Sequence, residues 1–104
     1  MVLSVARVEA ASRRLDFDWD TKKAQANQSK HGICFEDAAQ VFLDPNRIET
    51  FDGRQEYGED RWKTVGLVRL ALLAVVYAVR DKDSETIRLI SARKADAYER
   101  TQYG

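Results

Sequence analysis

Alternating hydrophobic and acidic residues mark the first clear element of the chain. Leu15, Phe17 and Trp19 are separated by single aspartates, which is the pattern of a strand with one buried face. Residues 1–14 show only a weak helical spacing of valines before this strand begins. We therefore expect an N-terminal extension over residues 1–14 and one domain over residues 15–104.

Two helices are predicted to follow this strand. Asp20 can cap a run of good helix formers, and Gly32 can end that helix at a positive φ angle. Apolar residues then recur at helical spacing from Phe35 to Phe42, until Pro45 stops the pattern. Because the connection between them is short, we expect the two helices to form a hairpin.

The second half of the chain predicts a sheet and one more helix. Polar turns separate four hydrophobic stretches, at residues 47–51, 61–67, 72–80 and 86–91. Strands joined by short loops pair antiparallel. Ser91 can cap a last helix over residues 92–103, packed on the sheet. The predicted fold class is α+β, an antiparallel β-sheet with an N-terminal helix hairpin and a C-terminal helix.

The composition fits one small domain without a membrane segment. The chain has 104 residues, 44% of them hydrophobic, which suits a single core. Its longest apolar run, Leu70 to Val79, is about half of the roughly 20 residues that cross a bilayer. The first residues lack a secretory signal. With one cysteine, Cys34, and one histidine, His31, neither a disulfide nor a zinc site is predicted. We expect a cytoplasmic protein that needs no metal or other cofactor.

The charge balance argues against a nucleic-acid partner for the molecule as a whole. The chain has 17 basic and 17 acidic residues, whereas proteins that bind phosphates usually carry a basic excess. The acidic residues concentrate between Glu36 and Asp60, and many basic residues lie elsewhere. Local basic patches are therefore still possible.

One group of polar residues shares a stripe on the first predicted helix. Lys23, Asn27, Lys30 and His31 follow one another at intervals that place them on one side. A substrate phosphate could lie along this stripe. Alternatively, Lys30 and His31 are in the last turn because cations favour that end of the helix dipole, and the rest is solvated surface.

A second group lies near the C-terminus. Arg93 and Lys94 fall in the first turn of the predicted last helix, where positive charge opposes the helix dipole and could bind an anion. They could equally pair with Asp96 or Glu99.

A third group lies on predicted strands. Arg88 faces away from its hydrophobic neighbours, and Arg61 and Lys63 open another strand, so these cations could meet on one side of the sheet. They could also be ordinary surface salt-bridge partners. The sequence has no glycine-rich phosphate loop, no histidine pair and no serine elbow. Cys34, between two hydrophobic residues, is interpreted as structural.

Read together, these residues resemble the BrnT family of toxins. From Phe17 to Asp44 the chain fits the pattern FxWDxxKxxxNxxKHGxxFExAxxVFxD. Further similar segments follow at residues 58–61, 64–66, 73–77, 80 and 87–95. The resemblance covers residues 15–103. Two departures are Cys34, where the family often has a serine cap, and the turn 68–71, which lacks a glycine.

The resemblance implies a RelE-like fold and a ribonuclease that blocks translation. It also implies a BrnA-type antitoxin partner, whose ribbon-helix-helix part binds operator DNA, so that this chain would reach DNA only through that partner. Without a metal, cleavage would use the RNA 2′-hydroxyl as the nucleophile, with a base beside it and cations on the phosphate.

Roles can be assigned to the candidate residues on this hypothesis. His31 or Glu59 would act as the base. The phosphate and the transition-state charge would be bound by Arg61, Arg80 and Arg93. Substrate-binding cations would be Lys23, Lys30, Arg88 and Lys94.

Two alternatives remain at this stage. The same cations could dock the acidic surface of a partner protein without any catalysis, which the zero net charge favours. The chain could also be an inactive toxin that acts as a corepressor with a DNA-binding partner.

Overall fold

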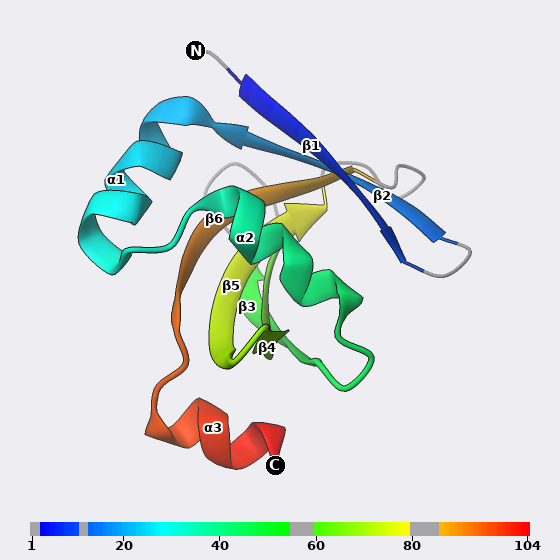
Figure 1. The fold of residues 1–104 in the computed structure, drawn as a ribbon, viewed down its shortest axis with the longest axis vertical. Coiled ribbons are helices and arrows are strands. Elements are labelled where there is room, and N and C mark those ends of the chain that lie inside the picture. The colour runs from blue at the N-terminus through cyan, green and yellow to red at the C-terminus, as the bar shows by residue number, and fades with distance from the viewer. Residues whose placement is uncertain (1–2, 11–12, 55–59, 80–85) are drawn as a thin grey trace.

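A computed structural model describes residues 3–10, 13–54, 60–79 and 86–104 of the chain. It has an α+β fold in which six strands form one sheet, in the order β1-β2-β6-β5-β4-β3 (Figure 1). The strands are β1 (Leu3–Ala10), β2 (Arg13–Asp20), β3 (Ile48–Arg54), β4 (Asp60–Val68), β5 (Ala71–Val79) and β6 (Thr86–Lys94). The helices are α1 (Thr21–His31), α2 (Phe35–Ala39), the short 3-10 helix η1 (Gln40–Leu43) and α3 (Ala97–Tyr103).

The first strand and helix of the predicted domain are confirmed. In β2, Phe17 and Trp19 are buried against the helices. The side chain of Asp20 caps α1 by accepting a hydrogen bond from the Lys22 amide at 2.9 Å. Gly32 ends the helix with φ 72°, a conformation that glycine adopts without steric cost.

The second predicted helix is present, but its last turn is tighter than expected. Residues Phe35–Ala39 are α-helical and the chain continues as the 3-10 helix η1. Cys34 occupies the N-cap position and makes no side-chain cap hydrogen bond, as expected where a thiol replaces a serine hydroxyl. Asp44 ends the pair, and its carboxylate accepts from the Asn46 amide at 2.9 Å.

The sheet departs from the predicted antiparallel arrangement at its N-terminal side. Residues 3–10, expected to show helical spacing, form β1 and pair antiparallel with β2. β2 in turn pairs parallel with β6, from Asp16 opposite Thr86 to Asp18 opposite Arg88. The purely antiparallel prediction is wrong here because two helices and three strands intervene between β2 and β6, and this long crossover allows them to run in the same direction.

The last helix starts later than predicted. Residues 92–94 do not begin a helix, because they continue β6 and pair with Leu73, Ala74 and Val75 of β5. Ser91 therefore lies within the strand and is not a cap. The helix α3 begins at Ala97 behind Asp96, which forms a capping box with Glu99.

The hairpin between β4 and β5 shows how the chain turns without the expected glycine. Arg69 adopts a positive φ of 56°, a conformation that costs energy for residues with a Cβ atom. Leu70, beside it, is fully exposed.

The sheet separates two hydrophobic clusters. The larger one packs α1, α2 and η1 against residues such as Phe17, Val75 and Leu89, and we call this side the helix-pair face. The smaller one joins Val65, Ala74 and Ala95 with Ile48, Leu72 and Tyr103 beneath α3, and we call this side the α3 face. Alternation along the strands assigns each strand residue to one of these faces. Within the described residues, no helix is long and apolar enough to cross a membrane.

Candidate functional site

Among the residues whose side chains the structure describes, four cations project from the α3 face of the sheet. On β4, Arg61 and Lys63 alternate with residues of the larger core and share the face of Val65. On β6, Arg88 lies between the buried Ile87 and Leu89 and therefore points the other way. Arg93 pairs with Ala74, which belongs to the cluster under α3. The cations of β4 and β6 thus flank the small apolar residues of β5.

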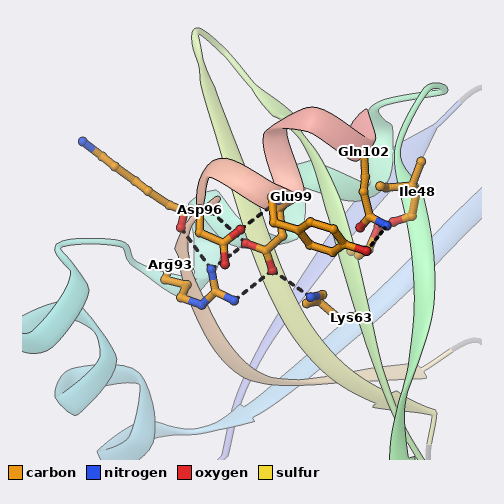
Figure 2. Close-up of polar contacts among 9 residues, drawn as sticks. Ile48, Lys63, Arg93, Asp96, Glu99 and Gln102 are labelled. Carbon is orange, nitrogen blue, oxygen red and sulfur yellow. Dashed lines mark hydrogen bonds and ion pairs between the residues drawn. The ribbon is translucent and has the colours of Figure 1, made fainter. Parts of the chain in front are cut away.

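Glu99 of α3 binds two of these cations (Figure 2). Its carboxylate accepts from Arg93 Nη1 at 2.7 Å and from Nη2 at 2.9 Å, a bidentate pair. Lys63 Nζ lies 2.7 Å from Glu99 Oε2, and the Asp96 amide donates to Oε1 at 2.9 Å. Only 1% of the Glu99 side chain is exposed. Two cations thus share one buried carboxylate, and the charges of Asp96 and Asp52 also act on Arg93.

The electrostatics hold this cluster in its ionised form. The hydrogen bonds from Arg93, aided by those from Lys63 and the Asp96 amide, lower the pKa of Glu99 to about 2 against the opposing effect of burial. The hydrogen bonds that Arg93 donates to Glu99 raise the pKa of Arg93. Glu99 is therefore a carboxylate at neutral pH and orients two charged donors.

The C-terminal end of α3 is bound to Asp44, the residue that follows η1. The Tyr103 hydroxyl donates to Asp44 Oδ2 at 2.5 Å, and the Leu67 amide donates to the same oxygen at 2.8 Å. Partial burial disfavours ionisation of Asp44, but the hydrogen bonds from Tyr103 and from two backbone amides lower its pKa overall. The pKa of Tyr103 is raised by its bond to Asp44. Both ends of α3 are thus fixed by polar contacts.

The other two cations lie further along the same face. Arg61 and Arg88 both pair with Ala78, one from each side of β5. Arg88 Nε lies 3.9 Å from Asp18 Oδ1, and 18% of the Arg88 side chain is exposed. In the described part of the chain, Arg61 Nε and Arg88 Nη2 are buried and have no hydrogen-bond partner.

The predicted stripe on α1 does not join this group. Lys23 and Lys30 are exposed on α1, and His31 is the last residue of that helix, on the side of the helix-pair face. Asn27 is buried rather than part of a polar surface. Its Nδ2 donates to Ile33 O at 3.0 Å and to Ala92 O at 2.9 Å, and its Oδ1 accepts from the Ala92 amide at 3.0 Å.

The remaining candidates are distributed as follows. Lys94 follows Arg93 on β6 and therefore points to the opposite face, where it lines a depression with Gly32 and Ile33. The predicted anion site at a helix N-terminus is wrong, since Arg93 and Lys94 end a strand. The alternative, pairing of Arg93 with Glu99, is confirmed. Glu59 and Arg80 lie outside the described residues.

Sequence reasoning missed the central position of Glu99. A usable signal was present, because an aspartate three residues before a glutamate, as in Asp96 and Glu99, is the pattern of a capping box. That pattern would have started the last helix at Ala97 and left Arg93 on a strand. Among the described residues, no group of histidine, cysteine and carboxylate side chains could hold a metal ion.

Comparison with known proteins defines the class and then the family. The fold places a cationic sheet face under a C-terminal helix. Residues 19–99 match the family model of the ribonuclease toxin BrnT of type II toxin-antitoxin systems. The chain is thus a toxin of the type II class, and it belongs to the BrnT family.

A solved structure agrees with this assignment. The chain is similar to the crystal structure of the Brucella abortus ribonuclease toxin BrnT, with 30% sequence identity and a TM-score of 0.56. The similarity covers 75% of this chain and 92% of the Brucella chain. A search of curated proteins finds no match.

Proposed function

We propose that this chain is a metal-independent endoribonuclease toxin that inhibits translation by cleaving RNA on the α3 face. The family supports ribonuclease activity in general. The observation that carries the location is the gathering of Arg61, Lys63, Arg88 and Arg93 on one face of the sheet, two of them oriented by the buried Glu99. A local group of cations can attract a phosphate even though the net charge of the whole chain is zero.

The proposed reaction uses the RNA itself as the nucleophile. The 2′-hydroxyl oxygen attacks the neighbouring phosphorus, its proton passes to the base, and the bond to the 5′-oxygen breaks as that oxygen takes up a proton. The products are a 2′,3′-cyclic phosphate and a 5′-hydroxyl. Lys63 and Arg93 bind the scissile phosphate and stabilise the charge that develops on its oxygens. Because Glu99 already fixes both side chains, little reorganisation is required.

The remaining candidates also receive proposed roles. Glu59 is the proposed base and Arg80 is proposed to add charge to the phosphate, on the strength of the family resemblance, since both lie outside the described residues. His31, Lys23, Lys30 and Lys94 belong to the helix-pair side, so we propose that the chemistry proceeds without them. Removal of one of these four cationic or titratable side chains should preserve cleavage.

We further propose the partner and cellular setting implied by the family. A type II toxin implies an antitoxin. We propose a BrnA-type antitoxin that neutralises the toxin, forms a hetero-oligomer with it and binds operator DNA through a ribbon-helix-helix part. On this proposal the fold is RelE-like and the complex acts in the cytoplasm.

Expression of this chain alone tests the proposal. Wild-type induction should arrest growth and fragment total RNA, whereas the Arg61→Ala/Arg93→Ala variant should do neither. Lys23→Ala, which removes an exposed cation from α1, is the matched control and should remain toxic. Each purified protein is checked for a cooperative thermal transition and for antitoxin binding. Intact RNA and normal growth with folded wild-type protein would instead support a non-catalytic binding module or corepressor.

A further inference from the structure

Arg61 and Arg88 each hold a hydrogen-bond donor that no described residue uses. Arg61 Nε and Arg88 Nη2 are both buried, and the described residues supply no acceptor for either atom. A buried donor left without an acceptor destabilises the fold, and more so when the group is charged. Such donors are available to an acceptor from outside the protein, whether a bound ligand or water.

The geometry places these two guanidinium groups around one position of the sheet. Arg61 and Arg88 lie on either side of β5, and both pair with Ala78, which is fully buried. Two strand spacings separate their Cα atoms by about 10 Å, a gap that two arginine side chains can close over a small residue. Asp18 lies 3.9 Å from Arg88 Nε and partly offsets the charge of that guanidinium group. Guanidinium groups are well suited to bind phosphate through paired N–H donors.

The Arg61 and Arg88 pair is separate from the cluster at Glu99. The Glu99 carboxylate is fully engaged by Arg93, Lys63 and the Asp96 amide. Arg61 is two residues before Lys63 on β4, a displacement of about 7 Å along the strand. The α3 face therefore carries two adjacent centres, each built on two cationic side chains.

We propose that Arg61 and Arg88 form a second phosphate subsite, which binds the RNA linkage next to the scissile one. This inference rests on the proposed function, because it takes Lys63 and Arg93 as the site of the scissile phosphate. The substrate is then a single-stranded RNA of at least three nucleotides, whose two successive phosphates span both centres.

The test measures binding rather than cleavage, so that it is independent of catalytic activity. The probe is a 2′-O-methyl trinucleotide, which cannot be cleaved, with either one of its two linkages replaced by an uncharged methylphosphonate. Binding to the ¹⁵N-labelled full chain is followed by NMR titration. For the wild type, each replacement should raise Kd by about 10-fold or more, in line with a lost charge-assisted hydrogen bond.

The variants assign each linkage to a subsite. In Arg61→Gln/Arg88→Gln, one replacement should no longer change Kd, while the other keeps its full effect. In Lys63→Gln, the replacement that lost its effect in the double variant should again raise Kd, and the other replacement should no longer change Kd. Lys22→Gln, which removes an exposed cation from α1, should retain both effects. If the double variant does not fold, Arg61→Gln alone provides the same comparison.

The outcomes separate the two hypotheses. If the Arg61 and Arg88 variant keeps both effects, or loses both equally, the second subsite is wrong, even if the wild type cleaves RNA. If the linkages separate as expected but the wild type cleaves no unmodified RNA, the subsite stands as an RNA-binding element and the proposed nuclease activity fails.

Discussion

At the scale of single residues, Asn27 shows how a polar side chain can be structural although its spacing suggests a surface role. Its amide joins α1, the loop after it and β6 through three hydrogen bonds. The sequence could not indicate this because the partners are backbone groups, two of them in Ala92, 65 residues away. Lys23, Lys30 and His31 share the helical spacing of Asn27 but do not share its environment.

We expect Asn27→Ala to lower the free energy of unfolding by about 2 to 4 kcal/mol, because it leaves buried backbone groups of Ile33 and Ala92 without partners. Urea denaturation of the purified protein measures this change. Gln28→Ala, at the exposed neighbouring position, is the control and should change stability by less than about 0.5 kcal/mol. Equal effects of both variants would show that the hydrogen bonds of Asn27 are not important for stability.

At the scale of elements, the pattern of the sequence located most helices and strands but placed the end of β6 incorrectly. Leu15, Phe17 and Trp19 predicted β2 correctly, since local alternation was reinforced by the core. Ser91 and the apolar residues after it suggested a helix start. Pairing with β5 overrides this local preference, so the strand runs on to Lys94.

The helix α3 depends on its cap and its docking contacts. It has seven residues, too few to be stable as an isolated helix. Asp96→Ala removes the side chain that accepts from the Glu99 amide at 2.8 Å and should cost about 1 kcal/mol. Hydrogen exchange should then accelerate in α3 while the amides of β5 keep their protection.

Thr101→Ala serves as the comparison in the same helix. Thr101 is exposed and its hydroxyl donates to Ala97 O, so its removal should leave exchange in α3 nearly unchanged. Faster exchange across the whole sheet in Asp96→Ala would mean that α3 is not a locally opening unit.

At the scale of the whole molecule, the sheet order and the site were predictable only in part. Alternation around Arg88, and the separation of Arg61 from Lys63 by one residue, already suggested that cations share a face. The parallel contact of β2 with β6 joins segments some 70 residues apart, which local patterns do not encode. For the same reason, the position of Glu99 over both Lys63 and Arg93 required the assembled fold.

Because Glu99 connects α3 to two strands, its ionisation couples the stability of the whole molecule to pH. Its pKa in the folded protein is about 2, below its ordinary value of 4.5. A lowered folded-state pKa stabilises the protein above the unfolded value, and this contribution is lost as the pH falls from about 4.5 towards 2. From the size of the shift, the loss amounts to at most about 3 kcal/mol.

The expected signature is a difference between wild type and Glu99→Gln that depends on pH. At pH 7 the variant should be less stable by about 3 kcal/mol, since the neutral amide leaves Lys63 and Arg93 without their counter-charge. As the pH falls from about 4.5 towards 2 the two proteins should converge, because the wild type loses the same charge by protonation. Urea denaturation at a series of pH values measures both curves. A constant difference from pH 7 to pH 2.5 would show that Glu99 acts only through shape and neutral hydrogen bonds, and that its charge does not hold α3 on the sheet.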